Sequence, residues 1–214
     1  MSLRYAPFLD MAISSHELTA LLVAVSFAAG LNVYATLATL GLLAQTGVLT
    51  LPVSLHAVSN WYVIGVSAAL FALELFADKI PIFDLVWNAL HTFIRIPIAA
   101  LLAYKATAQL SPSHQIIAAV AGALIALAAH GGKTAARAMI TTSPEPLSNI
   151  ALSTGEDVVA VGLTWFASKH PYIASGIVLV ALVIVVIFFR FVLRSLRALF
   201  RGAEHGIAPP ATQS

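Results

Sequence analysis

Long apolar runs separated by short polar stretches fill most of this chain. They predict six membrane-spanning helices, because about 20 apolar residues are needed to cross the hydrocarbon core of a bilayer. The expected spans follow one another along the chain: 18–44, 61–76, 83–104, 115–139, 147–167 and 172–189. The last run is uniformly apolar and rich in β-branched residues, so we expect it to face lipid.

Several runs contain residues that interrupt a helix. Gly30 and Asn32 lie in the first run, Pro97 in the third, Gly131 in the fourth and Gly155 in the fifth. Proline removes a main-chain hydrogen bond, and glycine permits a break or a close helix contact. We therefore expect an all-α, polytopic transmembrane helix bundle with broken or re-entrant helices near Gly30, Pro97, Gly131 and Gly155.

A basic stripe follows the last apolar run. Its four arginines recur at intervals of four, three and four residues and share one helical face: Arg190, Arg194, Arg197 and Arg201. We expect this helix to lie on anionic lipid headgroups. Residues 1–201 are then a single transmembrane domain that ends in a basic juxtamembrane helix, and residues 202–214 are a flexible cytoplasmic tail.

Composition agrees with a membrane location. The 214 residues are 60% hydrophobic and only 9% charged, with a mean hydropathy of +0.93. A soluble domain carries about 25% charged residues, so this chain cannot cover a water-facing surface. Cysteine is absent, which excludes a disulfide framework, a cysteine nucleophile and a cysteine metal site.

Lysine and arginine set the expected orientation. The four terminal arginines place the C-terminus in the cytoplasm, and an even number of spans places the N-terminus there too. Lys79, Lys133 and Arg137 then fall on the cytoplasmic side. Only Lys105 and Lys169 fall outside, so the expected six spans and the positive-inside rule agree.

Polar residues cluster in the stretch 74–97. Asp84, Asn88, His91 and Arg95 fall at i, i+4, i+7 and i+11, so they share one helical face. Ionisable groups at membrane depth are costly and usually mark a function. The stripe fits a cavity lining, a proton path or an anion site, and the alternative is a structural network that locks helices together. His91 is the best single protonation candidate because imidazole titrates near neutrality.

Glu74 and Asp78 lie four residues apart at the cytoplasmic end of the second span and share a face. Together they fit a cation site, although ordinary interfacial charge explains Asp78 equally well. In the first span, Asn32 beside Gly30 indicates a break. Main-chain groups exposed by a break are tolerated at membrane depth only where protein or a wet cavity covers them. We therefore expect a central site between the first and fourth spans.

Basic residues share one face of the fourth span. His130, Lys133 and Arg137 fall at i, i+3 and i+7, and with Arg95 they fit a basic pocket for a phosphate, a carboxylate or a lipid headgroup. Anchoring at the cytoplasmic surface is the alternative, above all for Arg137.

Acidic and amide residues of the fifth segment are the counterpart of this basic face: Asn149, Glu156 and Asp157. The two acids lie well inside an apolar segment, so we expect them to pair with Arg95 or Lys133. A purely structural ion pair is the alternative.

No strong catalytic motif occurs, since HExxH, GxSxG, a glycine-rich phosphate loop and GxGxxG are all absent. His91 and His130 with the carboxylates could hold a metal, but their spacing is not diagnostic. We therefore expect no cofactor, leave a metal open, and regard an enzyme as less favoured.

Five strings together resemble an uncharacterised bacterial integral membrane protein family, domain of unknown function 4126: GLNVYATLATLGLLA, ELFADKIPIFD, HTFIRIPIAALLA, HGGKTAARAMITTSPEPLSN and GED. The resemblance covers residues 29–157. It implies a multi-pass protein of the bacterial inner (plasma) membrane and supplies no activity.

These patterns favour a small transporter or ion- or proton-coupled permease, working as a homo-oligomer among membrane lipids. Its substrate would be a small anion or cation, with no nucleic acid involved. The alternatives are a lipid-binding or structural membrane protein and, third, an intramembrane metal-dependent enzyme. We expect Arg95 to lie close to Glu156 or Asp157, with His91 facing the same interior. A polar stripe that faced lipid would contradict the functional interpretation.

Overall fold

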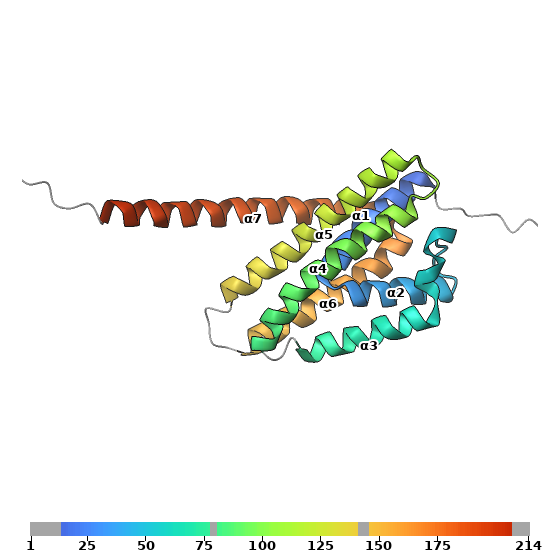
Figure 1. The fold of residues 1–214 in the computed structure, drawn as a ribbon, viewed down its shortest axis with the longest axis horizontal. Coiled ribbons are helices and arrows are strands. Elements are labelled where there is room, and N and C mark those ends of the chain that lie inside the picture. Colours follow the sequence, from blue (N-terminus) through green and yellow to red (C-terminus); the bar gives the residue numbers. More distant parts are fainter. Residues whose placement is uncertain (1–13, 78–80, 141–145, 207–214) are drawn as a thin grey trace, which may run out of the picture.

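The computed structural model describes residues 14–77, 81–140 and 146–206, and every regular element in these ranges is helical (Figure 1). Seven α-helices and one short 3-10 helix follow in order: α1 Ser15–Leu31, α2 Val33–Gln45, η1 Val53–Ser59, α3 Trp61–Ala77, α4 Pro81–Ala106, α5 Pro112–Ile140, α6 Pro146–Lys169 and α7 Pro171–Gly206. The expected all-α class is confirmed.

Three segments among the described residues are long and apolar enough to cross a membrane: Pro112–Arg137, Ile150–Lys169 and Pro171–Ser195. A fourth candidate combines η1 with Trp61–Phe76 across a bend of 55°. Helices α1 and α2 are apolar but shorter. Length and composition therefore support three or four spans, and they do not confirm six.

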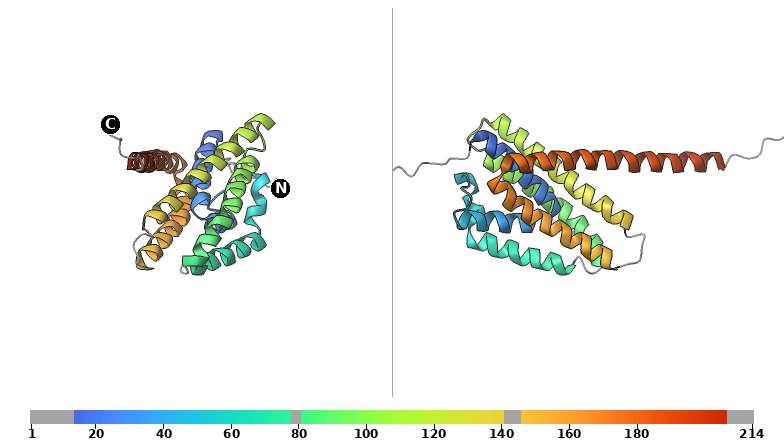
Figure 2. Two further views of the ribbon diagram at one scale, coloured as in Figure 1. Left: turned by 60° about the vertical axis from the view of Figure 1, so that its left-hand side comes forward. Right: turned by 180° about the vertical axis from the view of Figure 1, so that it is seen from behind.

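Helices α3, α4, α5 and α6 run back and forth along one tilted bundle (Figures 1 and 2). A hydrogen bond from Ser54 to the Lys105 carbonyl ties η1 to the end of α4. Helix α1 lies in the middle and packs on α4, α5, α6 and α7. The centre of the bundle is thus where the first helix ends.

Helices α1 and α2 form a V-shaped helical hairpin, and the chain reverses at Asn32 (Figure 1). Leu40 of α2 consequently lines the same small cavity as Leu21 of α1. Residues 47–50, which follow α2, line a pocket of about 410 Å³ together with Glu17 at the start of α1. Helix α1 therefore begins, and α2 ends, at the same side of the bundle, and the turn between them lies inside it.

The break expected near Gly30 is confirmed, whereas the breaks expected at three other positions are wrong. Helix α4 continues through Pro97, α5 through Gly131 and α6 through Gly155. A proline costs one main-chain bond, which neighbouring helices make tolerable in an apolar bundle. Gly131 instead permits close packing, because a Cβ there would lie 3.2 Å from the Phe189 ring of α7.

Small residues bring the hairpin apex close to α5. A Cβ on Gly30 would clash with the main chain of Ala126 and lie 2.8 Å from the Cβ of Ala129. Both alanines are buried. Contacts between small residues let helix main chains approach closely in apolar surroundings, so this glycine fixes how near the apex lies to α5.

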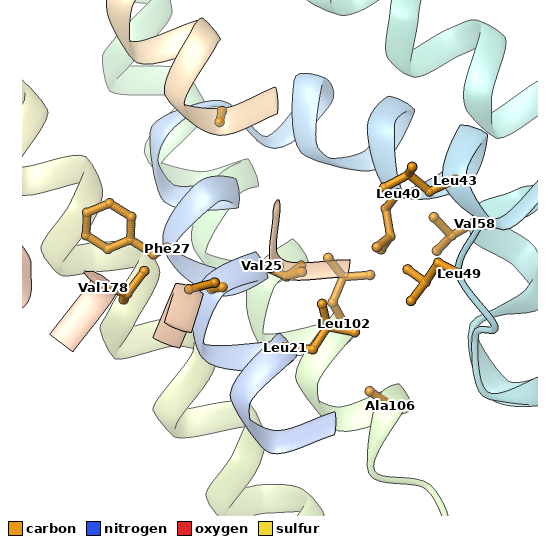
Figure 3. Packing of buried hydrophobic residues seen from close by; sticks show 14 of the residues in the cluster. Leu21, Val25, Phe27, Leu40, Leu43, Leu49, Val58, Leu102, Ala106 and Val178 are labelled. Atoms are coloured by element: carbon orange, nitrogen blue, oxygen red, sulfur yellow. The ribbon is translucent and has the colours of Figure 1, made fainter. Parts of the chain in front are cut away.

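Leucines and a valine fill the open side of the V (Figure 3). Leu21 and Val25 of α1 face Leu40 and Leu43 of α2, with Leu102 of α4 between the two arms. Because these side chains are buried, removing them from water or lipid holds the two arms in one arrangement.

A capping box starts helix α1. The Ser14 hydroxyl accepts from the Glu17 main-chain N–H at 3.2 Å, and the Glu17 carboxylate accepts from the Ser14 N–H at 2.9 Å. This reciprocal pair satisfies two of the free donors of the first turn. The main-chain hydrogen bond of Ser14, followed by that of its hydroxyl, lowers the pKa of Glu17 from its ordinary value.

Helix α7 leaves the bundle as it proceeds toward the C-terminus (Figure 1). Ala174 and Val178 are buried, but only 6% of the most apolar 18-residue stretch of α7 is buried. Its 36 residues span roughly 54 Å at 1.5 Å per residue, more than the hydrocarbon core. The helix continues to Gly206.

Candidate functional site

Six charged side chains are buried among the described residues, three acids and three bases: Glu74, Glu156, Asp157, Arg95, Lys133 and Arg137. They form two groups in the bundle interior. The apex cluster consists of the Leu31 carbonyl, Asn32, Lys133, Arg137, Glu156 and Asp157. The arginine–histidine cluster consists of Glu74, Thr92, Arg95 and His130.

The apex cluster satisfies the two helix ends that meet at the hairpin turn. Lys133 Nζ donates to the Leu31 carbonyl at 3.3 Å, where α1 ends. The Asn32 side chain accepts from the Ala35 N–H at 2.9 Å and caps α2, while its amide donates to Asp157 Oδ1 at 2.8 Å. A cation thus lies at a helix C-terminus and an anion near a helix N-terminus, the arrangement that both macrodipoles favour.

Glu156 links α6 to two bases of α5. Its Oε2 atom accepts from Lys133 Nζ at 2.8 Å and from an Arg137 nitrogen at 2.9 Å. Its Oε1 atom is buried and has no hydrogen-bond partner in the part of the chain that the structure describes. One carboxylate oxygen therefore serves two cations while the other serves none of the described groups.

The arginine–histidine cluster joins α3, α4 and α5. Arg95 forms an ion pair with Glu74 and donates to His130 Nδ1 at 3.1 Å, and His130 Nε2 lies 2.7 Å from the Thr92 hydroxyl. A guanidinium only donates, so His130 Nδ1 must accept. The imidazole is then neutral, with its proton on Nε2 and directed at Thr92.

His91 faces the interior, as expected. Its Nε2 atom lies 3.1 Å from the Tyr34 hydroxyl, and the two rings meet edge to face with centroids 5.3 Å apart. His91 is only 3% exposed. The contact ties α4 to α2 just beyond the hairpin turn.

Most residues expected at a site are buried in this interior: Asn32, Glu74, His91, Arg95, His130, Lys133, Arg137, Glu156 and Asp157. Asp78 lies outside the described residues, as do the side chains of Asp84, Asn88 and Asn149. Arg137 is an interior ion-pair partner, where surface anchoring was the alternative.

The expected pairing of Arg95 with Glu156 or Asp157 is wrong, because Arg95 pairs with Glu74. Glu156 pairs with Lys133, as expected, and with Arg137 in addition. Helical periodicity gives the face on which Arg95 lies, but it does not give the helix that packs against this face.

Two polar partners in this interior, Tyr34 and Thr92, were not among the residues expected at a site. Neither lies on the stripe of spacing three and four that marks the charged residues. Thr92 follows His91 directly, and Tyr34 lies two residues after Asn32. Polar neighbours of a candidate residue in an apolar run are therefore the signal that would have found them.

No group of three or more histidine, aspartate or glutamate side chains among the described residues is placed to hold a metal ion.

The long apolar helices and the buried charged residues of the described ranges suggest a membrane protein. A family model described as "Domain of unknown function (DUF4126)" matches residues 19–191, and the chain belongs to this family. The resemblance noted from the sequence is confirmed. No curated protein and no solved structure matches the chain significantly.

Proposed function

We propose that this protein is a small transporter of the bacterial inner membrane that moves an ion, or a substrate coupled to protons, through its buried polar centre. One observation carries the proposal: a helical hairpin ends inside the bundle, and its apex lies in a cluster of charged side chains. Helix ends within the membrane commonly form the substrate and ion sites of transporters.

The energetics of the buried charges support this function. A charged side chain inside a membrane protein is expensive, and an ion pair there returns only part of the cost. Apolar side chains of similar size would hold the helices together at less expense. Charges retained in both clusters are therefore better explained by a task that needs them.

The hairpin supports a specific topology. Its arms of 17 and 13 residues extend roughly 25 and 20 Å, less than a hydrocarbon core of about 30 Å. Helices α3 to α7 would make five crossings, with the terminal arginines in the cytoplasm. Ser14 would then lie on the outer side. This topology replaces six crossings and two cytoplasmic termini.

Labelling of single cysteines tests this topology, because the chain has no cysteine of its own. Ser14→Cys and Ser195→Cys should react with a membrane-impermeant reagent from opposite sides. Labelling of both positions from the cytoplasmic side would restore the six-span arrangement.

Reconstitution into liposomes tests the transport itself. Wild-type protein should carry a pH- or ion-dependent flux, and Lys133→Met should abolish it, because Lys133 joins the hairpin to Glu156. Lys105→Met is the matched control, since Lys105 is exposed. Absence of any ion- or pH-dependent flux in folded wild-type protein would remove the proposal.

A structural or lipid-binding role is the second candidate. The balance of three buried acids and three buried bases favours it, because such a network fits a fixed helix assembly. If the role is structural or lipid-binding, a folded variant in which Glu74 and Arg95 are both replaced by methionine would keep full function. For either role we expect a homo-oligomer surrounded by lipid, which light scattering of the purified protein measures.

A further inference from the structure

Glu156 uses its two carboxylate oxygens unequally. Two cations share Oε2, at 2.8 and 2.9 Å, while Oε1 is buried without a partner among the described residues. Buried polar atoms are nearly always hydrogen-bonded, so an exception calls for an explanation. Glu156 is 8% exposed, and bulk water therefore does not supply the missing bond.

We propose that Glu156 occupies the place of an anionic substrate on Lys133 and Arg137, and that a proton taken up at Oε1 releases both bases to a small oxyanion. The inference rests on the proposed transporter function and names its substrate class, a carboxylate or an inorganic oxyanion such as phosphate or sulfate. One proton would accompany each anion that binds.

The pair of bases has the geometry of an oxyanion site, as Glu156 itself demonstrates. Lys133 and Arg137 lie one helical turn apart on α5, and both are buried. Both already hold a carboxylate at hydrogen-bonding distance. A lysine supplies a compact charge and an arginine a planar fork of donors, and both bind carboxylate and phosphate oxygens.

A proton is required because the exchange would otherwise leave a buried charge. Once an oxyanion holds the two bases, Glu156 would remain beside Asp157 of its own helix with no cation. A buried carboxylate next to a second acid takes up a proton to become neutral. The bond that forms is O–H at Oε1, and the bonds that break are the two ion pairs at Oε2.

Charges on the neighbouring helices set the conditions of this exchange. Lys133 and Arg137 face Glu156 from α5, and Asp157 accompanies it on α6, held by Asn32 at the hairpin turn. Arg95 of α4 and Glu74 of α3 also interact electrostatically with Lys133. Lys133 also holds the Leu31 carbonyl, so a bound oxyanion would lie beside the apex of the hairpin.

Calorimetry on purified full-length protein tests the exchange with inorganic phosphate, sulfate and acetate as probes. Titrations in buffers of different ionisation enthalpy give the protons taken up per anion bound. Wild-type protein should take up about one proton per anion, and its affinity should rise up to about tenfold per unit fall in pH. Binding without proton uptake, or no binding at any pH at which the protein is folded, would overturn the proposal.

Variants sharpen this test. Glu156→Gln imitates the protonated acid, so it should bind the same anions with no proton uptake and with an affinity that does not change with pH. Glu156→Gln with Lys133→Met keeps the charge balance but removes half of the site, so it should not bind. Equal binding by both variants would contradict the inference. If Glu156→Gln does not fold, the number of protons that the wild-type protein takes up per anion decides the question.

Transport and exchange fail in distinguishable ways. Liposome flux that does not depend on oxyanions, in a protein that binds none of them, leaves the transporter and removes the exchange. Oxyanion binding with proton uptake in a protein that shows no flux leaves the exchange and removes the transporter.

Discussion

The two buried charge clusters lie in the same bundle but use their charges differently. In the arginine–histidine cluster, Arg95 meets one acid, and its second contact fixes the tautomer of His130. In the apex cluster, two bases share one oxygen of Glu156 while the other oxygen has no described partner. In the first arrangement one guanidinium contacts a carboxylate and an imidazole. In the second, two bases converge on one carboxylate oxygen.

This difference teaches how a charge network can be both structural and exchangeable. The ion pair of Arg95 and Glu74, with His130 held in one tautomer, has a single favourable arrangement, so it holds α3, α4 and α5 together. In the proposed exchange, two bases on one oxygen have a second arrangement, in which they hold another anion. Under that proposal the apex cluster is the site and the arginine–histidine cluster its support.

The largest expected effects come from two single variants, each of which removes one acid from one of the two clusters. Glu74→Gln leaves Arg95 buried without its carboxylate, and Glu156→Gln leaves Lys133 and Arg137 without theirs. Each change should lower the free energy of unfolding by about 3–5 kcal/mol, the usual result of breaking a buried pair from one side. Unfolding in mixed micelles, followed by tryptophan fluorescence, measures the loss.

Phosphate separates the two variants. It should recover much of the stability lost in Glu156→Gln, because a bound anion stabilises the folded state in proportion to its occupancy. It should stabilise Glu74→Gln no more than it stabilises the wild-type protein, because the site at Lys133 and Arg137 is unchanged there. Equal recovery in both variants, or none in either, would show that the two clusters do not differ as described.

A smaller effect is expected when the hairpin turn loses its polar side chain. Asn32→Leu removes the cap of α2 and the partner of Asp157 Oδ1, and it should cost about 2 kcal/mol. Asn32→Asp keeps the cap but sets a second acid against Asp157, so it should be destabilised mainly at neutral pH and recover on acidification. A pH series of unfolding curves measures both variants, and a pH-independent Asn32→Asp would contradict the contact.

The smallest effect tests the apex without changing charge. Gly30→Ala forces α1 away from Ala126 and Ala129 of α5, which should cost about 1–2 kcal/mol as an overpacked contact. Gly155→Ala is the matched control, because nothing lies within 4 Å of its Cβ position. The control should gain about 0.5–1 kcal/mol from higher helix propensity. A harmless Gly30→Ala would mean that the apex does not lie against α5.

The sequence predicted helices and the burial of their charged residues well, for one physical reason. A charge in an apolar run cannot face lipid, so His91, Arg95, Lys133 and Glu156 had to face inward. The break at Asn32 was predictable too, because an Asn that follows a glycine can end one helix and cap the next.

Angles and neighbours were not predictable in the same way. A residue that ends a helix does not set the direction of the next one, so the reversal at Asn32 was missed. Periodicity placed Arg95 on a face but did not identify Glu74 as its partner. A proline such as Pro97 breaks or kinks an isolated helix, yet α4 continues through it because the surrounding bundle holds the helix.

The hairpin turn also imposes an order of events while the chain is being made. Lys133 follows Leu31 by 102 residues, and Asp157 follows Asn32 by 125 residues. At a synthesis rate of about 5–20 residues per second, Asp157 emerges roughly 6–25 s after Asn32. Until Lys133 and Asp157 have been made, the turn lacks these charged partners, so we expect it to remain in the headgroup layer. Entry of the hairpin into the bilayer would then be the closing step of assembly, after α5 and α6 have been inserted.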